Sequence, residues 1–302
     1  MFLNYVVVDV FTTTRFKGNP LAIVQVPANY WSSLSQEAKQ LIAVEFNLSE
    51  TIFLHEPPED SQDPTESVSV DIFTPKCEIP FAGHPTIGSA AYIFQNYPRA
   101  ANGGLKELVT KAGRIPVSQD LNTSLVSASI PFDYHLHQTP VLSSLAVSGA
   151  APVTSIVKGM TFVLAELRDL DCLKDVSAGL VEDCIRPQGL DEGWNHGLMA
   201  TKYYVDLGKN EQGCRQLRTR MFVSWEDPGT GSASSALSCF LALEEPKEQG
   251  SGPFEYHIVQ GVEIGRRNDI FVRVSRSVDG ERITEVLLRG TSVLVSEGRI
   301  TV

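Results

Sequence analysis

Hydrophobic and polar residues alternate along the chain in short β-like runs that are separated by helical patterns. Residues 4–11 (NYVVVDVF) and 21–26 (LAIVQV) are rich in β-branched side chains, and the turn-like KGNP lies between them. Apolar positions then recur at helical spacing over 34–46, and Ser33 and Gln36 fit a capping box ahead of this stretch. The pattern predicts two strands followed by a helix.

The same alternation continues to about residue 94. Residues 50–54 and 67–73 predict strands on either side of an acidic, proline-containing loop at 55–66. An apolar stretch of small residues predicts a helix over 86–94. Turn residues and short β-like pieces between 117 and 140 then indicate a domain boundary.

The second half of the chain repeats this style. β-rich stretches at 155–167, 201–207 and 219–225 lead into another helix of small residues after 226. Further β-rich segments fill the chain from 257 onward. We therefore expect two α+β halves.

Two helix starts resemble each other across these halves. Residues 85–94, PTIGSAAYIF, match 229–237, GTGSASSAL, after one gap, and each stretch follows a predicted strand. An internal duplication would give two similar lobes related by a pseudo-twofold axis, each with a helix N-terminus at the cleft between them. The alternative is that G-S-A sequences are simply common where helices begin.

Length, charge and cysteine content restrict the kinds of function. The 302 residues suit one large domain or two of about 150 residues. A formal net charge of −11 argues against nucleic acid or an anionic membrane as partner, because both need a basic surface. There is no apolar run near the ~18 residues of a membrane span. Five scattered cysteines suit free thiols, so we expect a cytoplasmic protein.

Three ionisable residues accompany the two helix starts. His84 lies beside the first, Asp227 precedes the second, and Glu50 begins a strand on the face of Ile52 and Leu54. A helix N-terminus binds carboxylate or phosphate through its N–H groups and dipole. A carboxyl group on an apolar face tends to have a raised pKa, which suits acid/base catalysis.

Each of these residues also has a purely structural interpretation. Glu50 would be a charge at a strand edge, Asp227 a helix cap, and His84 a buried histidine bonded to a backbone carbonyl. Motifs for serine hydrolases, P-loops and dinucleotide sites are missing. The pair His135 and His137 is most simply explained by strand alternation. We therefore expect no metal and no cofactor, so that any chemistry has to use side-chain acids and bases.

These motifs together resemble the PhzF family of phenazine biosynthesis-like isomerases, which share the two-lobed fold of diaminopimelate epimerase. The matching stretches occur in the order of the family and span nearly the whole chain. They are DVFT and FKGNPLAIV within 9–24, LSETIF at 48–53, FTP and EIPFAGHPTIG within 73–88, EDPGTGSA at 226–233, and QGVEIGR at 260–266.

The resemblance implies an α+β fold of two similar lobes. Residues 1–120, completed by the last strand at about 288–302, would form the N-terminal lobe, and 121–287 the C-terminal lobe. Each would be a mixed or antiparallel sheet wrapped around a central helix, with the active site in the cleft between them. Two positions depart from the family: Gly229 stands where alanine is frequent, and Arg267 where proline is usual.

Roles for single residues also follow from the resemblance. Glu50 matches the family's catalytic glutamate, which takes a proton from one carbon of the substrate and returns one to another. His84 and Asp227 match its polar catalytic partners. The substrate-binding positions that the resemblance implies are Gly83, Gly231, Ser232, Thr230 and Asn19.

The implied function is a cofactor-independent isomerase. It would move a proton and a double bond on a small unsaturated carboxylate, dihydro-hydroxyanthranilate-like, in secondary metabolism, and it would form a homodimer. A lyase or cyclase with the same base, or a non-catalytic carboxylate-binding protein, are the alternatives. A two-thiol racemase is improbable because Cys77 and Cys239 lie several residues from the helix starts.

Overall fold

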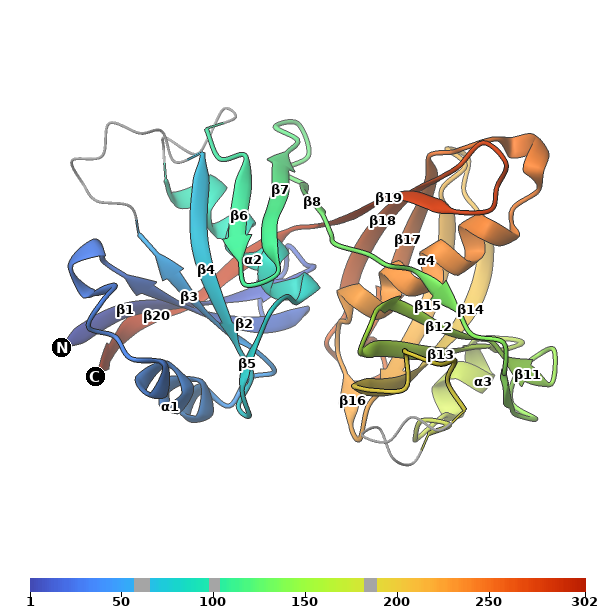
Figure 1. Ribbon diagram of the computed structural model, residues 1–302, viewed down its shortest axis with the longest axis horizontal. Coiled ribbons are helices and arrows are strands. Elements are labelled where there is room, and N and C mark those ends of the chain that lie inside the picture. Colours follow the sequence, from blue (N-terminus) through green and yellow to red (C-terminus); the bar gives the residue numbers. More distant parts are fainter. Residues whose placement is uncertain (57–65, 98–103, 182–188) are drawn as a thin grey trace. The chain divides into compact units, whose positions relative to one another are not determined.

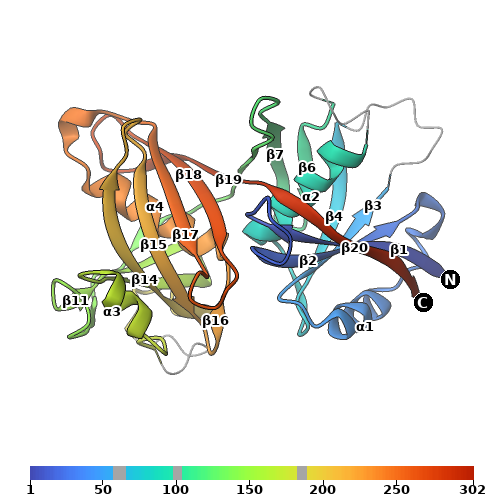
Figure 2. The same cartoon turned by 180° about the vertical axis from the view of Figure 1, so that it is seen from behind.

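The chain folds into two units, each built around one long helix (Figures 1 and 2). The computed structural model describes residues 1–56, 66–97, 104–181 and 189–302. Unit 1 comprises Met1–Ile130 with Arg289–Val302, and unit 2 comprises Pro131–Leu288. The first stretch of unit 1 therefore ends at residue 130, ten residues later than the expected boundary at 120/121. The reason is that one further strand pairs with the sheet of unit 1.

Unit 1 is a mixed sheet around helix α2 (Gly83–Asn96). Its strands, in the order of their pairing, are β20 (Ser292–Thr301), β1 (Phe2–Val10), β2 (Asn19–Val26), β3 (Thr51–His55), β4 (Ser67–Phe73), β6 (Glu107–Thr110), β7 (Gly113–Gln119) and β8 (Val126–Ser129). Strand β5 (Glu78–Ile79) pairs with the end of β4, while α1 (Gln36–Phe46) and a 3-10 turn (Ala28–Tyr30) connect β2 to β3. Because α2 contacts strands from β20 to β8, the sheet curves around the helix.

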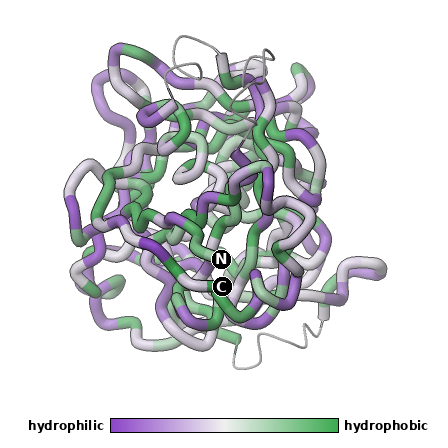
Figure 3. The backbone as a smooth tube through the Cα atoms, turned by 90° about the vertical axis from the view of Figure 1, so that its left-hand side faces the viewer, coloured by the Kyte–Doolittle hydropathy of each residue, from purple (hydrophilic) through white to green (hydrophobic). Residues whose placement is uncertain are grey.

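The two ends of the chain meet in unit 1. Strand β20 runs antiparallel to β1, and the amino group of Met1 donates a hydrogen bond of 2.9 Å to the carbonyl of Val302. Figure 3 marks the two termini beside each other. The last strand therefore completes the sheet that the first strand begins.

Helix α2 is buried on all sides from Gly83 to Phe94, as is typical of a central core helix. It begins three residues before the predicted start at 86, so that His84 and Pro85 lie in its first turn. A proline is tolerated there because the N–H groups of the first turn have no partner within the helix.

Unit 2 is a second mixed sheet around helix α4 (Gly231–Glu244). Its strands, in the order of their pairing, are β9 (His135–Leu136), β12 (Val153–Val157), β13 (Met160–Glu166), β14 (Leu198–Lys209), β15 (Arg215–Phe222), β17 (Phe254–Gln260) and β18 (Asn268–Arg276). Strand β16 (Glu226–Asp227) pairs with the end of β15, and α3 (Leu170–Asp175) follows β13. The remaining elements are a hairpin of β10 (Val141–Leu142) and β11 (Ala150–Ala151), a 3-10 turn (Lys247–Gln249), and β19 (Ile283–Gly290) at the unit boundary.

The two units repeat one pattern of strand pairing. β2–β3 and β4–β6 are parallel pairs, while β3–β4 and β6–β7 are antiparallel. In unit 2, β13–β14 and β15–β17 are parallel, while β14–β15 and β17–β18 are antiparallel. β5 and β16 are equivalent as well, because each pairs with the end of the preceding strand and each precedes a helix of 14 residues. The prediction of two similar α+β units is confirmed.

The predicted cap of the first helix is wrong. The N-cap of α1 is Ser35, whose Oγ accepts a hydrogen bond from the N–H of Ala38 at 3.1 Å, whereas we had placed the cap at Ser33. The β-rich stretch 155–167 forms two strands, because a turn separates β12 from β13. Gly159 takes a φ of 85° in this turn, a conformation that favours glycine.

Arg276 fixes the C-terminal end of α4 from strand β18. Its guanidinium is 1% exposed and donates hydrogen bonds of 2.7–2.9 Å to the carbonyls of Ala242, Glu245, Pro246 and Gly250. The last carbonyls of a helix have no partner within the helix. One buried cation therefore satisfies carbonyls of the last turn of α4 and of the chain that follows.

Replacing Arg276 by methionine should lower the free energy of unfolding by about 3 kcal/mol or more, because buried carbonyls lose their donors. Arg273→Met is the matched control on the same strand. Arg273 pairs with Glu255 at a partly exposed position, so its loss should cost at most about 1 kcal/mol. Urea unfolding of both variants measures this, and equal losses would contradict the anchoring role of Arg276.

Candidate active site

Glu50 and His84 lie next to each other in unit 1. Glu50 directly precedes β3, and His84 is the second residue of α2. Oε2 of Glu50 is 3.4 Å from Nδ1 of His84, with 18% and 5% of these side chains exposed. Two residues that are far apart in the sequence thus form one pair, because α2 packs against β3.

The surroundings of Glu50 favour its protonated form. Burial raises the pKa of Glu50 to about 7, although a hydrogen bond with Ser49 opposes the shift. Desolvation disfavours the charged carboxylate, which is the cause of the rise. A carboxyl group with a pKa near neutrality can take up and give back a proton at the same pH.

Asp227 organises the loop that leads into α4. Its carboxylate accepts hydrogen bonds from the hydroxyl of Thr230 and, at 3.4 Å, from the N–H of Gly229. Thr230 is the N-cap residue of α4, and Gly231 and Ser232 are its first two residues, both buried. Asp227 therefore holds the loop rather than capping the helix directly.

The other predicted positions divide between the two units. Gly83 is the first residue of α2 beside His84, and Asn19 is a buried residue at the start of β2. Ser232 occupies in α4 the place that His84 occupies in α2, since each is the second residue of its helix. The sequence match, which paired Ser232 with Ser89, is therefore out of register. Unit 1 thus holds Glu50, His84, Gly83 and Asn19, whereas unit 2 holds Asp227, Thr230, Gly231 and Ser232.

The two long helices begin without a side-chain cap. Neither Ala82 before α2 nor Thr230 before α4 makes a capping hydrogen bond, whereas Ser35 caps α1 and Asp169 caps α3. The first N–H groups of a helix need partners, and they favour negative charge. The helices that carry the predicted site are therefore suited to hold an anionic group at their start.

The departure of Gly229 from the family pattern has a structural reason. The side-chain amide of Asn268 donates to the carbonyls of Pro228 and Arg266 at 2.6 and 2.7 Å. A Cβ at position 229 would lie 2.2 Å from Oδ1 of Asn268. Glycine therefore lets Asn268 hold the same loop from the other side.

Sequence reasoning missed Lys202 and Gln260, two fully buried polar residues beneath the start of α4. Nζ of Lys202 donates hydrogen bonds to Oε1 of Gln260 at 2.7 Å and to Oγ of Ser234 at 2.9 Å. The sequence feature that could have revealed Lys202 is a lysine within the apolar strand β14, in which every residue from Met199 to Val205 is buried. Such a residue seldom enters a core without polar partners.

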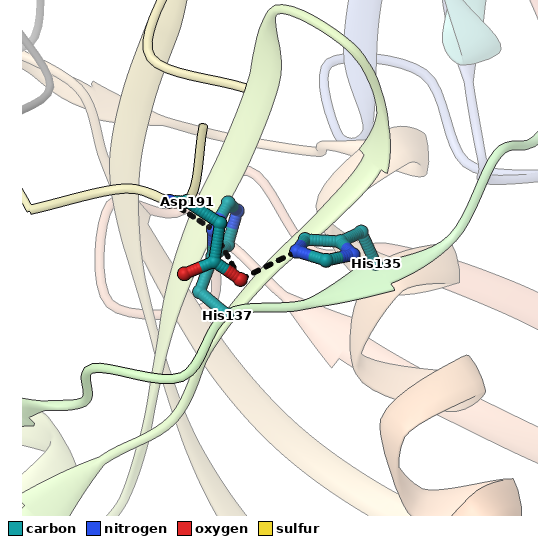
Figure 4. A group of neighbouring side chains, drawn as sticks. All are labelled: His135, His137 and Asp191. Carbon is teal, nitrogen blue, oxygen red and sulfur yellow. Dashed lines mark hydrogen bonds and ion pairs between the residues drawn. The ribbon is translucent and has the colours of Figure 1, made fainter. Parts of the chain in front are cut away.

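A second cluster of titratable side chains lies in unit 2, apart from the predicted residues in sequence. His135, His137 and Asp191 place ligand atoms within 4.8 Å of one another (Figure 4). Nε2 of His135 is 2.7 Å from Oδ2 of Asp191, and the indole of Trp194 stacks on His135. The histidine bond holds the pKa of Asp191 below its ordinary value. Two histidines and a carboxylate are a common donor set for metals.

The hydrogen bonds of His137 argue against a metal at this cluster. Its Nδ1 accepts a bond of 3.2 Å from the N–H of Asp191, and its Nε2 is 2.9 Å from Oγ of Ser155. Burial also lowers the pKa of His137, which favours the neutral ring that these bonds require. The cluster thus offers two ready ligands, and a catalytic zinc usually takes three from the protein. We assign it the role of tying Asp191 and Trp194 to β9.

The cysteines of the described residues are placed unlike the base and acid of a two-thiol racemase. Cys77, Cys172, Cys214 and Cys239 form no disulfide with one another. Cys239 is buried within α4, where desolvation raises the pKa of its thiol and disfavours the reactive thiolate. Cys184 lies outside the described residues.

Solved structures show which fold this repeated α+β pattern forms. A PhzF-family phenazine biosynthesis protein of Bacillus anthracis matches over 100% of both chains with a TM-score of 0.74 at 22% identity. A hydroxyproline epimerase of Agrobacterium vitis matches over 99% of this chain and 92% of its own, with a TM-score of 0.59 at 12% identity. The fold is therefore that of the PhzF-like and epimerase-like proteins.

The family follows from the sequence comparisons. The family model described as "Phenazine biosynthesis-like protein" (PhzC-PhzF) matches residues 8–298, and the chain belongs to this family. An uncharacterized isomerase of Pasteurella multocida is 31% identical over 283 residues, 90% of this chain and 87% of its own. A trans-2,3-dihydro-3-hydroxyanthranilate isomerase of Pseudomonas aeruginosa is 28% identical over 98% of both chains. The chain is an isomerase of the PhzF type.

Replacing Glu50 by glutamine should change how stability depends on pH. A carboxyl group whose pKa rises from 4.5 to about 7 on folding binds more protons when folded, so it destabilises the protein progressively between these values. The full effect above pH 7 is about 3 kcal/mol. Glu50→Gln escapes this loss, so its stability relative to the parent should rise by up to about 3 kcal/mol between pH 4.5 and 8.

Urea unfolding across that pH range measures the difference. Glu45→Gln is the control, since Glu45 is an exposed glutamate on α1, and its difference from the parent should stay flat. A flat difference for Glu50→Gln as well would show that the Glu50 carboxyl ionises as it does in water.

Proposed function

We propose that this isomerase moves a proton, and with it a double bond, on a small unsaturated carboxylate by general acid/base catalysis with Glu50. The observation that carries the proposal is the contact of Glu50 with His84 at the start of a buried helix, together with a Glu50 pKa of about 7. The relatives named trans-2,3-dihydro-3-hydroxyanthranilate isomerase, at 28–29% identity, support a substrate of the dihydro-hydroxyanthranilate class.

The proposed reaction needs one group to act twice. The Glu50 carboxylate removes a proton from an sp³ carbon next to the double bond, and the C–H electron pair forms a new double bond as the old one shifts. The protonated Glu50 then returns a proton to the far carbon of the original double bond. No electrons leave the substrate, so the product is an isomer. His84, at 3.4 Å from Glu50, would orient the carboxyl group or relay the proton.

The remaining predicted residues would bind the substrate. The first turns of α2 and α4, which have no side-chain cap, would supply N–H groups for a carboxylate. Asp227 would accept a hydrogen bond from a polar substrate group, and Thr230 and Ser232 would add hydroxyl donors. These assignments are part of the proposal and follow the positions that the resemblance implied.

Replacing Glu50 by glutamine should lower kcat for trans-2,3-dihydro-3-hydroxyanthranilate by about 10²–10⁴-fold, the usual contribution of a general acid/base. Substrate binding should change little, because glutamine has nearly the same size. The reaction is followed by NMR in D₂O, where deuterium should appear at the newly protonated carbon. Glu45→Gln is the control and should match the parent.

The outcomes of this experiment separate the alternatives. Full turnover by Glu50→Gln would contradict the proposed base. A product that has lost a group or closed a ring would indicate a lyase or cyclase instead. Binding without a changed product and without deuterium exchange, in the parent itself, would indicate a non-catalytic carboxylate-binding protein.

The pH dependence of kcat/KM should show the ionisation of Glu50 in the free enzyme. Because the base must be a carboxylate, kcat/KM should rise with pH and approach a plateau above the Glu50 pKa of about 7. Initial rates between pH 5 and 9 measure this profile. A plateau that is already reached at pH 5.5 would contradict a raised pKa at the base.

Three expectations from the sequence stay predictions: a homodimer, a cytoplasmic location and a place in secondary metabolism. Within the described residues no helix is long and apolar enough to cross a membrane. Light scattering of the purified protein would decide between a monomer and the proposed homodimer.

A further inference from the structure

Lys202 is a buried lysine on the side of β14 that faces α4. It is 0% exposed, and its Nζ donates hydrogen bonds to Ser234 on α4 and to Gln260 at the end of β17. A buried ammonium group is costly unless hydrogen bonds replace its water. Its two partners therefore determine what the side chain can do.

Two donors fix the orientation of the Gln260 amide: Oε1 accepts the short bond of 2.7 Å from Lys202 and a longer one of 3.4 Å from the N–H of Thr230. Lys202 is a donor, so it selects the orientation in which Oε1 of Gln260 faces it. The amide nitrogen of Gln260 then points the other way and donates to the carbonyl of Asp227 at 2.7 Å and to Oγ1 of Thr230 at 3.2 Å. The Thr230 hydroxyl in turn donates to the Asp227 carboxylate. A chain of bonds thus runs from Lys202 to two predicted site residues.

The internal repeat shows that the strand framework does not need polar residues at the positions of Lys202 and Asp227. In unit 2 Lys202 lies opposite Met221, which lies opposite Asp227 across β14, β15 and β16. In unit 1 the equivalent strands β3, β4 and β5 place Ile52 opposite Ile72, which lies opposite Ile79. The same framework therefore forms with isoleucine in both places. The polar residues Lys202 and Asp227 are therefore specific to unit 2.

We propose that Lys202 is a positioning residue of the candidate active site, which orients the Gln260 amide and through it holds Asp227 and Thr230 at the start of α4. Its effect on catalysis rests on the proposed function, whereas its effect on the geometry of the loop does not. Lys202 is not proposed to touch the substrate.

The electrostatics of Lys202 agree with this role. Burial lowers the pKa of Lys202 to about 7, and the negative charge of Asp227, the charged group that acts on it, opposes the shift. An amine can donate a hydrogen bond whether or not it carries the extra proton. The orientation of Gln260 therefore persists on both sides of neutral pH.

The test compares Lys202→Met with Gln260→Leu, their double variant, and Ser234→Ala as the matched control. Ser234→Ala removes the other partner of Lys202 and leaves the chain through Gln260 intact, so its kcat should equal that of the parent. Each of the other single variants should lower kcat for trans-2,3-dihydro-3-hydroxyanthranilate by about 10- to 100-fold, the usual result of a small misplacement. The double variant should be no worse than the worse single one, because both changes break one chain.

A second measurement needs no substrate. The side-chain amide of Gln260 is buried and donates two hydrogen bonds, so NMR should show its hydrogens protected from exchange in the parent and in Ser234→Ala. In Lys202→Met this protection should be lost or reduced at least tenfold. The isoleucine at the equivalent position of unit 1 suggests that an apolar residue can be accommodated. If Lys202→Met does not fold, the neutral polar variant Lys202→Gln takes its place with the same expected results.

The two measurements fail in different ways. If the parent does not turn over the substrate, the proposed function fails while the NMR result still decides the role of Lys202. If Lys202→Met retains the protected Gln260 amide, Lys202 is only a structural charge and the proposal is overturned. Losses of kcat that add up in the double variant would overturn it as well.

Discussion

A helix that begins inside a protein has to find partners for its first N–H groups, and this constraint governs both units. α2 and α4 are buried and start without a side-chain cap, whereas the surface helices α1 and α3 are capped by Ser35 and Asp169. Small residues at the starts of the two long helices allow close approach to their backbone. The positive end of each helix dipole then favours an anion. The proposed substrate carries such a charge, which an acidic protein would otherwise repel.

The duplicated framework gives each unit the same helix start and a different chemistry beside it. Unit 1 has Glu50 with His84 against an apolar strand face, and this burial makes ionisation of the carboxyl costly. Unit 2 has Ser232 in place of His84, and Lys202 and Asp227 in place of Ile52 and Ile79. One half therefore carries the proposed base, and the other a network that holds its polar side chains in place.

Local patterns were enough to predict most strands, both long helices and the existence of a repeat, but the match between the two helix starts was out of register. They failed where the deciding contact is not local. Ser33 and Ser35 are equally good caps by composition, and only the backbone geometry selects Ser35. The contact of Glu50 with His84 was not visible either, because it depends on how α2 packs inside its sheet. Lys202 was missed because the partners that make its burial possible, Gln260 and Ser234, come from two other elements of the fold.

The burial of Glu50 has a cost in stability that contacts elsewhere in the fold have to offset. Below its pKa of about 7 the buried carboxyl group is protonated, and the folded protein loses stability as this group ionises. Such a cost is sustained only if the surrounding elements are fixed by other contacts. In unit 1 the pairing of the two terminal strands contributes to this, since β20 closes the sheet around α2. In unit 2 Arg276 anchors the far end of α4. Arg276 therefore stabilises α4 at the end opposite to the helix start, where the proposed site lies.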